Sequence, residues 1–274
     1  MKYNNELKVI DTQEKAYLLG FLYGDGTIST YKCKDENSYS FYTRISINKD
    51  DEELIYQLHK EFSFFNIGEF DYSIYGGKTG WQKSISKTGK LLYDDLLLNG
   101  LYPRKSYENK EKLKLPNICN DLMSHFIRGF FDADGSVYTR AKRKNLITIE
   151  FSSVSKSFIT ELNSYLKSID INCWKIVEVT SLKDNRQIYY KLVFIKTDEI
   201  LKLIDFMYRD ANIKLKRKAT KCLVYKPVNK VIDRNIICPE CGNDKVWING
   251  YRGNSTRYKC QECKIGFSIK NILN

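Results

Sequence analysis

The sequence predicts an α+β fold made of two pseudo-symmetric αββαββα repeats with antiparallel sheets, followed by a small C-terminal zinc β-ribbon. Three observations support this prediction. Residues 18–28 and 126–137 are both apolar, helix-like segments that end in Asp-Gly. Their aspartates, Asp25 and Asp134, lie 109 positions apart, which indicates an internal duplication. Two Cys-x-x-Cys pairs near the end of the chain have the spacing typical of tetrahedral zinc sites.

The first repeat is expected to begin with the helix that carries the first Asp-Gly ending. Asp11 and Glu14 form a capping-box pattern at its start, and the apolar run continues to about Gly24. Period-two alternation, glycine turns and helical periodicity define the later elements of the repeat. These are strands at 27–33 and 39–48, a helix at 51–64, strands at 68–75 and 81–87, and a helix at 89–99.

The second repeat is expected to pass through the same elements after a seam at Pro116 and Asn117. They are a helix at 120–133, strands at 136–141 and 145–152, a helix at 155–169, a long hairpin across 173–195 and a helix at 198–209. The expected domain limits are 1–115 and 116–226 for the repeats, 227–235 for a basic linker and 236–274 for the zinc ribbon.

Small residues at four-residue spacing mark one face of each Asp-Gly helix. They are Gly20 and Gly24 in the first copy, and Gly129 and Ala133 in the second. Because such a stripe lets two helix backbones approach closely, the helices are expected to pack together and to bring the two terminal aspartates side by side. Adjacent carboxylates favour a divalent cation. For one copy alone, the alternative is a buried helix closed by an Asp-Gly turn.

The composition is that of a folded, basic protein. Across 274 residues, 42% hydrophobic side chains are enough to build cores, and a formal net charge of +12 implies an anionic partner, most commonly nucleic acid. The longest apolar run, residues 16–23, is far shorter than the ~20 residues that cross a bilayer, so no membrane partner is expected. The sequence begins without a hydrophobic signal region, which favours a reducing, cytoplasmic location in which cysteines are thiols or metal ligands.

Both Asp-Gly segments, LLGFLYGDGTI and FIRGFFDADGSV, resemble the LAGLIDADG motif of homing endonucleases, and the resemblance extends in outline to about residue 225. It implies that Asp25 and Asp134 are catalytic acids that bind two or three Mg²⁺ ions. It also implies saddle-shaped sheets that each face one DNA half-site. Asp132 matches a second acidic position of the motif, where the first copy has Tyr23.

Two lysines share the spacing of the acids. Lys87 and Lys196 are also 109 positions apart, and each follows an expected strand and precedes an expected helix. They match the auxiliary basic residue of the family, which implies a catalytic role, and the alternative is an ordinary surface lysine. The chain has two histidines, His59 and His125, which disfavours nuclease classes that use a histidine base, and a packing role is expected for His125.

Polar side chains on the outer face of each sheet are candidates for DNA contact. Alternation directs Phe41, Ile45, Ile47, Ile188, Tyr190, Leu192 and Phe194 toward the core. The opposite face has donors and acceptors suited to base edges, and an Arg-Lys pair after the last helix of each repeat suits phosphates. These candidates are Tyr42, Arg44, Ser46, Gln187, Tyr189, Lys191, Arg104, Lys105, Arg217 and Lys218, and for each one simple solvent exposure is the alternative.

The cysteines fall into two groups. One group is predicted to hold a single structural Zn²⁺, because four thiolates leave no open position for water; it consists of Cys238, Cys241, Cys260 and Cys263. This segment resembles the amino-terminal zinc ribbons of insertion-sequence transposases, which implies DNA binding, with Arg252 and Arg257 as candidate contacts. A structural clip or a protein-contact ribbon is the alternative. The other group, expected to be buried thiols with a surface thiol as the alternative, consists of Cys33, Cys119, Cys173 and Cys222.

These features together indicate a monomeric endonuclease that binds double-stranded DNA at a long target site and makes a double-strand break by Mg²⁺-dependent phosphodiester hydrolysis. A non-cleaving DNA-binding regulator and a maturase that binds intron RNA are alternatives on the same fold. The presence of both Asp25 and Asp134 favours the enzyme over the regulator, whereas the sequence does not separate the enzyme from the maturase.

Overall fold

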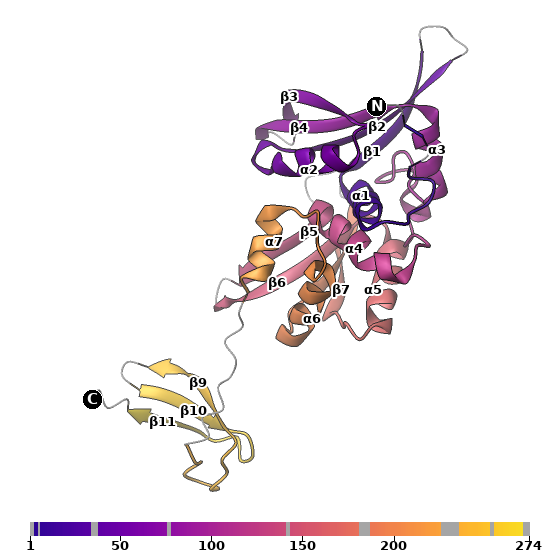
Figure 1. Cartoon of the computed structure of the whole chain (residues 1–274). Coiled ribbons are helices and arrows are strands. Elements are labelled where there is room, and N and C mark those ends of the chain that lie inside the picture. The colour runs from indigo at the N-terminus through magenta and orange to yellow at the C-terminus, as the bar shows by residue number, and fades with distance from the viewer. Residues whose placement is uncertain are drawn as a thin grey trace. The chain divides into compact units, whose positions relative to one another are not determined.

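The computed structural model describes residues 3–4, 6–33, 38–75, 78–140, 143–180, 187–225, 236–252 and 255–270. They belong to two compact units, Met1–Tyr225 and Lys226–Asn274 (Figure 1), and each unit is described by itself. The basic linker expected at 227–235 lies outside the described residues.

The first repeat folds into helices on one four-stranded antiparallel sheet. Its elements are α1 (Gln13–Gly24), β1 (Gly26–Lys32), β2 (Tyr39–Asn48), the 3-10 turn η1 (Lys49–Asp51), α2 (Glu53–Glu61), β3 (Asn66–Tyr75), β4 (Lys78–Thr88) and α3 (Lys90–Leu98). The strand order is β1-β2-β4-β3. A second 3-10 turn, η2 (Lys110–Lys112), lies in the connection to the next repeat.

The second repeat has the same order of elements and the same sheet. Its elements are α4 (Asn120–Asp134), β5 (Gly135–Arg140), β6 (Arg143–Ser153), α5 (Lys156–Ser168), β7 (Lys175–Thr180), β8 (Ile188–Phe194) and α6 (Thr197–Tyr208). The strand order, β5-β6-β8-β7, repeats that of the first sheet. The predicted fold class is therefore confirmed. One additional helix, α7 (Lys216–Leu223), was not expected from the sequence.

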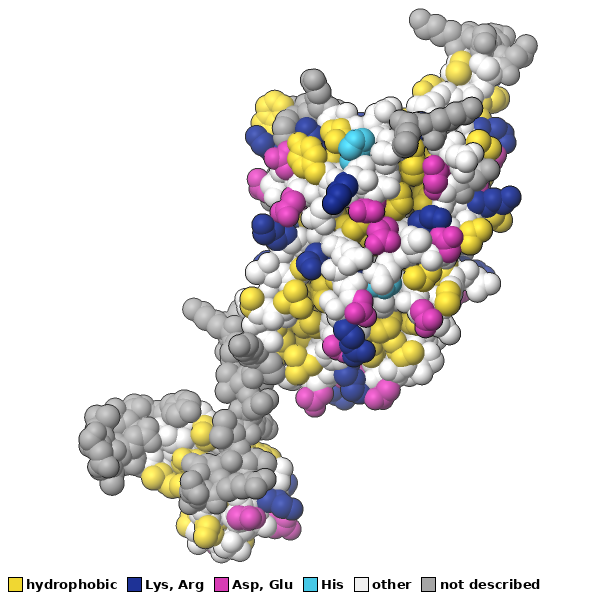
Figure 2. All heavy atoms as spheres, viewed as in Figure 1, with side chains coloured by type: hydrophobic (Ala, Val, Ile, Leu, Met, Phe, Trp, Pro, Cys, Tyr) yellow, Lys and Arg dark blue, Asp and Glu magenta, His cyan; other side chains and the backbone are white. Residues whose placement is uncertain are grey.

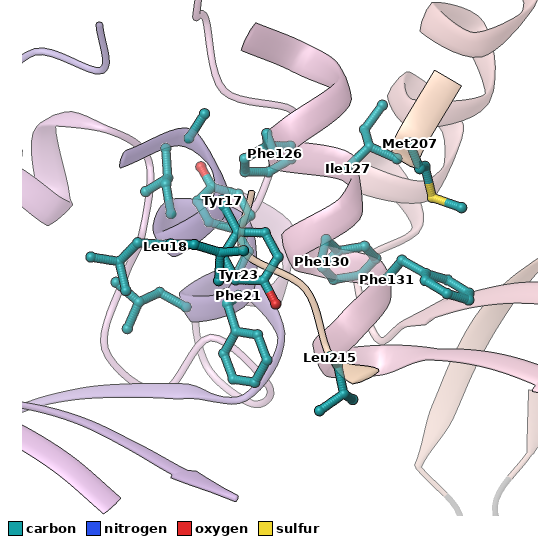
Figure 3. Packing of buried hydrophobic residues seen from close by; sticks show 14 of the residues in the cluster. Tyr17, Leu18, Phe21, Tyr23, Phe126, Ile127, Phe130, Phe131, Met207 and Leu215 are labelled. Carbon is teal, nitrogen blue, oxygen red and sulfur yellow. The ribbon is translucent and has the colours of Figure 1, made fainter. Parts of the chain in front are cut away.

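Helices α1 and α4 lie side by side between the two sheets (Figure 1). Their backbones approach so closely that a Cβ atom at Gly129 would lie 2.1 Å from the carbonyl oxygen of Tyr17, and one at Gly20 would lie 2.0 Å from that of Phe126. Aromatic side chains fill the space beside this contact (Figure 3); the rings of Tyr23 and Phe126, for example, meet edge to face at 5.0 Å. One continuous hydrophobic core therefore joins the two repeats.

Local details differ from the expectations in three places. Thr12, not Asp11, caps α1, because its side chain accepts the N–H of Lys15, while Asp11 forms an ion pair with the ammonium of Lys15 at 2.7 Å. The helix expected at 51–64 is shorter, since η1 precedes it and the chain leaves the helix after Glu61, where Phe62, Phe64 and Phe65 pack into the core. Ile188, expected to face the core, is 39% exposed at the start of β8.

The C-terminal unit is a three-stranded antiparallel sheet of β9 (Val246–Arg252), β10 (Ser255–Cys260) and β11 (Gly266–Lys270), in the order β11-β10-β9. Its small core contains Val246 and Tyr258, with the Tyr258 ring stacked on Phe267. Among the described helices of both units, none combines the length and the apolar composition that crossing a bilayer requires.

Candidate active site at the ends of the paired helices

The close contact of α1 and α4 continues to their C-terminal ends, where the two motif aspartates lie. A Cβ atom at Gly24 would lie 2.4 Å from the Cβ of Ala133 and 3.2 Å from the carboxyl carbon of Asp134. Asp25 follows directly as the C-terminal cap of α1, and its N–H donates to the carbonyl of Phe21 at 3.0 Å. The structure thus brings Asp25 and Asp134 together, and with them the four small residues of the stripe.

The two carboxylates disfavour each other's ionised form. Both side chains reach solvent, but neighbouring groups withhold part of the surrounding water, and Asp134 also borders a cavity lined by Gly24 and Lys105. This desolvation, followed by the charge of Asp25, raises the pKa of Asp134 to about 7. Desolvation also raises the pKa of Asp25, and nearby lysines partly oppose the rise. Oxygen ligands that are paired, desolvated and open to solvent fit a divalent cation such as Mg²⁺ or Ca²⁺.

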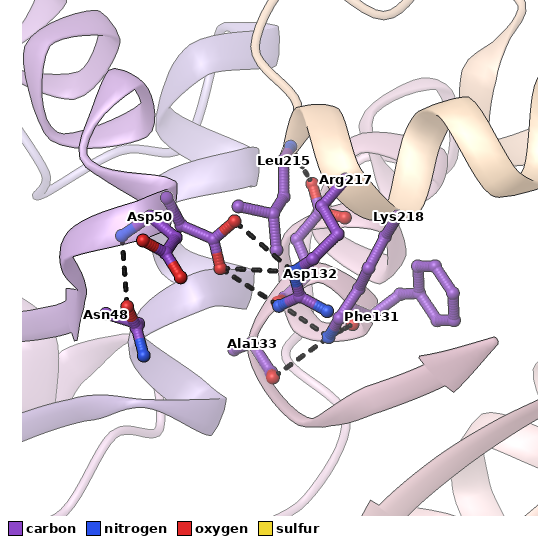
Figure 4. A network of polar contacts seen from close by, with 9 residues as sticks. Asn48, Asp50, Phe131, Asp132, Ala133, Leu215, Arg217 and Lys218 are labelled. Carbon is purple, nitrogen blue, oxygen red and sulfur yellow. Dashed lines mark hydrogen bonds and ion pairs between the residues drawn. The ribbon is translucent and has the colours of Figure 1, made fainter. Parts of the chain in front are cut away.

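Each repeat contributes one lysine to this pair of acids. Lys105 follows α3, and its ammonium donates to the carbonyl of Gly26, next to Asp25. Lys218, on α7, donates to the last carbonyls of α4 (Figure 4), those of Phe131 at 2.8 Å, Asp132 at 2.8 Å and Ala133 at 3.1 Å. Burial lowers the pKa of both lysines, that of Lys218 to about 8, and the two acids oppose this shift.

The lysines predicted from their spacing, Lys87 and Lys196, lie at the end of a strand and at the start of a helix. Lys87 lies on β4 opposite Thr43 of β2, and Lys196 caps α6, where its carbonyl accepts the N–H of Ile200 at 3.0 Å. The charges that act on the two carboxylates are those of Lys105 and Lys218. The sequence signal for Lys105 and Lys218 is the Arg-Lys pair after the last helix of each repeat, a pattern that predicts phosphate contact.

Asp132 is part of the motif, but its carboxylate is 2% exposed and hydrogen-bonded within the protein. It accepts the N–H of Leu215 at 2.7 Å and the hydroxyl of Tyr17 at 2.8 Å. At the matching position of the first repeat, Tyr23 donates its hydroxyl to the carbonyl of Asn99 at 2.7 Å. Both side chains are therefore engaged in hydrogen bonds within the protein.

Several candidate DNA contacts of the second repeat are engaged inside the protein. Lys191 forms an ion pair with Glu150 at 2.9 Å, and the amide of Gln187 donates to the carbonyl of Ser106 at 2.5 Å. Gln187 and Tyr189 line a cavity of about 330 Å³ that also borders Lys105 and Asp134. In the first repeat, the outer-face candidates on β2 are half-buried; they are Tyr42, Arg44 and Ser46.

The two arginines of the Arg-Lys pairs form ion pairs of their own. Arg217 pairs with Asp51 of the first repeat at 2.9 Å, and Arg104 pairs with Glu108 at 2.8 Å. On the face of the first unit that Figure 2 shows, basic and acidic side chains are likewise interspersed.

The C-terminal unit gathers its four organised cysteines into one cluster. Their sulfur atoms all lie within 4.8 Å of one another, with Sγ–Sγ distances of 3.5 Å for Cys238 and Cys263 and 3.6 Å for Cys241 and Cys260. Tetrahedral zinc with Zn–S bonds of about 2.3 Å needs sulfurs roughly this far apart, so the set fits a structural Zn²⁺.

The other cysteines are less uniform than expected. Cys222 is buried, Cys33 and Cys173 are intermediate, and Cys119 is exposed, in contrast to the buried position expected for it. Of the ribbon arginines, Arg257 is exposed, and the side chain of Arg252 lies outside the part that the structure describes.

Comparison with known proteins agrees with this geometry. A profile of the LAGLIDADG-like domain matches residues 121–205. The probable translation initiation factor IF-2 of Methanocaldococcus jannaschii is 31% identical over 228 residues, which cover 80% of this chain and 17% of that protein. The chain therefore spans less than a fifth of the length of this curated relative.

Solved structures resemble the chain in fold. The LAGLIDADG meganuclease I-AabMI bound to uncleaved DNA superposes with a TM-score of 0.50 at 16% identity, over 76% of this chain and 87% of that one. The structure of I-DmoI in complex with DNA and Ca has a TM-score of 0.47 at 18% identity, over 76% of this chain and 95% of that one. Residues 121–205 therefore form a LAGLIDADG-like domain, and the unit of two repeats that contains them has the fold of LAGLIDADG proteins.

Proposed function

We propose that this protein is a site-specific DNA endonuclease that makes a double-strand break by Mg²⁺-dependent hydrolysis. The observation that carries the proposal is the pairing of Asp25 and Asp134 at the ends of α1 and α4, with one lysine from each repeat beside them. The similar fold of a meganuclease bound to DNA supports the same class of activity.

The acids and the lysines have different roles in the proposed hydrolysis. Asp25 and Asp134 hold divalent cations, which supply charge neutralisation and an activated water at the scissile phosphates. Lys105 and Lys218 add positive charge where negative charge develops on the phosphoryl oxygens. Because the two repeats contribute equivalent groups about a pseudo-twofold axis, one phosphate on each strand is attacked, and the two sheets hold the two halves of a long site.

The zinc ribbon would extend the DNA contact of a monomeric enzyme. Thr256, Tyr258 and Cys260 alternate along β10 toward the ribbon core, so Arg257 and Lys259 lie on the opposite face. Trp247 pairs with Lys259 across the strands. Cations beside an aromatic ring suit a phosphate backbone and its exposed bases.

The test uses a library of duplex targets with Mg²⁺ and variants of the two acids. Asp25→Asn and Asp134→Asn should each lower double-strand cleavage by about a hundredfold or more while DNA binding persists, since the amide no longer neutralises the cation. Asp95→Asn is the control, because it makes the same substitution at a carboxylate that is buried and accepts a hydrogen bond from Tyr3 in the first repeat. Full cleavage by either motif variant would refute the site.

The same assay separates the two candidate pairs of lysines. Lys105→Met and Lys218→Met should slow cleavage, whereas Lys87→Met and Lys196→Met should not, because the first pair provides the charges that act on the acids. The opposite ranking would return the catalytic role to Lys87 and Lys196. Tight DNA binding without cleavage by the wild-type protein would favour the regulator, and selective binding of intron RNA would favour the maturase.

A further inference from the structure

The position of Lys218 depends on a short segment, residues 213–218, that leads from α6 into α7. Two side chains of α4, one helical turn apart, bind the backbone of this segment. The guanidinium of Arg128 donates through Nε to the carbonyl of Ile213 at 2.9 Å, and the carboxylate of Asp132 accepts the N–H of Leu215 at 2.7 Å. Successive backbone groups of the segment are therefore held by one face of the motif helix.

Leu215 is the N-cap residue of α7, so the bond from Asp132 fixes where that helix begins. The carbonyl of Leu215 accepts the N–H groups of Lys218 at 3.1 Å and Ala219 at 2.9 Å. Lys218 is the third residue of the helix, and its ammonium meets the carbonyl groups at the end of α4 (Figure 4). Displacing Leu215 would displace the whole first turn and the ammonium with it.

The side chains that form this contact are charged and deeply buried. Arg128 is 1% exposed and also donates to the carbonyl of Met207 at 2.9 Å, while its guanidinium lies over the ring of Tyr17 at 5.3 Å. The hydroxyls of Tyr17 and Tyr208 donate to Asp132. Burying two charges is costly unless both are fully hydrogen-bonded, and here one bond from each side chain is directed at the segment of residues 213–218.

The first repeat has a different arrangement at the matching positions. Leu19 and Tyr23 occupy the places of Arg128 and Asp132 when the two motifs are aligned on their Asp-Gly endings. Lys105 instead follows α3 and reaches the carbonyl of Gly26 directly. The two lysines are thus held by different means, although they flank the same pair of acids.

We propose that Arg128 and Asp132 are positioning residues, a backbone clamp that sets Lys218 at the acids, and that Asp132 acts through Lys218 and not as a metal ligand. This inference rests on the proposed function for its effect on cleavage. Because the clamp serves one of two lysines, its loss impairs one strand more than the other. A nicked duplex then accumulates.

The experiment compares Asp132→Leu, which removes the acceptor at similar volume, with Asp132→Asn, which keeps an oxygen that can accept the N–H of Leu215. With duplexes labelled on each strand, Asp132→Leu should cut one strand at least about tenfold more slowly than the wild type does. Lys218→Met should lower the cleavage rate of the same strand. The double variant should be no slower than Lys218→Met alone. Asp132→Asn should recover most of the rate. Asp95→Leu, the matched buried-carboxylate control, should affect both strands equally.

A second readout does not depend on cleavage. Hydrogen exchange at the amides of residues 213–219 should accelerate in Asp132→Leu but not in Asp132→Asn or Asp95→Leu. If Asp132→Leu does not fold, Leu215→Pro removes the N–H donor at a residue whose φ of −75° suits proline. Unchanged hydrogen exchange in Asp132→Leu would overturn the clamp. So would a cleavage rate in the Asp132→Leu, Lys218→Met double variant that falls by the product of the two single effects. Absence of cleavage by the wild-type protein would refute the proposed function. The hydrogen-exchange measurement would still test the clamp, because it does not depend on cleavage.

Discussion

At the scale of single residues, the guanidinium of Arg128 also determines the protonation of its neighbour on α4. Its Nη1 lies 2.9 Å from Nδ1 of His125. Arginine can only donate, so Nδ1 must accept, and the imidazole is neutral with its proton on Nε2. Burial, followed by the charge of Arg128, lowers the pKa of His125 to about 4. This agrees with the packing role expected for His125 from the sequence.

We expect the contribution of His125 to the stability of the protein to be lost in acid. Its pKa is about 4 when folded and 6.5 when unfolded, so between these values the unfolded chain binds the additional proton. The stabilising contribution is present above about pH 6.5, and up to about 3 kcal/mol of it is lost as the pH falls toward 4. In denaturant unfolding across this range, the free energy of unfolding of the wild type should fall relative to that of His125→Gln, whose amide can accept from Arg128 without titrating. An equal change in both proteins would contradict the prediction.

At the scale of secondary-structure elements, the paired helices were predictable because their pattern is local. Apolar runs with small residues every fourth position specify a helix and the face on which a second backbone can lie. The repeat of the same pattern then predicted the pairing of Asp25 and Asp134. Helix α7 was not predictable in this way, since its eight residues include three lysines and one arginine. Its contacts with α4, more than its own sequence, specify it.

The same distinction applies to the lysines. Equal spacing predicts a catalytic role for Lys87 and Lys196, and this stays a prediction that the cleavage assay tests. Lys105 and Lys218 reach the acids through tertiary contacts with Gly26 and α4. No local pattern encodes such contacts. A basic pair in the sequence is equally consistent with a contact to phosphate and with a position beside the acids.

The contact between α1 and α4 predicts a strong penalty for added volume. Gly129→Ala would place a Cβ atom 2.1 Å from the carbonyl oxygen of Tyr17, where rigid backbone prevents relief. We expect a loss of about 3 kcal/mol or more in the free energy of unfolding, which exceeds the gain of about 1 kcal/mol from the better helix propensity of alanine. Gly80→Ala is the control, because a Cβ there would meet no atom within 4 Å. Denaturant unfolding of both variants measures the difference, and equal stability of the two would contradict the close approach.

At the scale of the whole molecule, the chain contains two cores of very different size. The core of Met1–Tyr225 runs through both repeats, whereas that of the C-terminal unit consists of Cys238, Val246, Tyr258 and Cys260 with a few partly buried neighbours. Burying so few side chains, at roughly 1.5–3 kcal/mol each, cannot offset the conformational entropy of a folded ribbon. Zinc binding, which contributes on the order of 10 kcal/mol in small zinc domains, would make up the deficit at the four-cysteine cluster.

Removing the zinc should therefore unfold the ribbon alone. Cys241→Ser should lower the bound zinc from one ion per chain to none, because three thiolates hold the ion much more weakly, and should increase hydrogen exchange across β9, β10 and β11. The melting temperature of the larger unit should not change, since its core lies within Met1–Tyr225. Cys119→Ser is the matched control, because Cys119 is exposed and lies outside the cluster.

If the ribbon binds DNA, Cys241→Ser should also weaken DNA binding. The slope of the logarithm of the binding constant against the logarithm of the salt concentration should become shallower by about one unit for each phosphate that the unfolded ribbon releases. An unchanged salt dependence together with an unfolded ribbon would assign the ribbon to another partner, while a lower melting temperature for the larger unit would show that the two cores depend on each other.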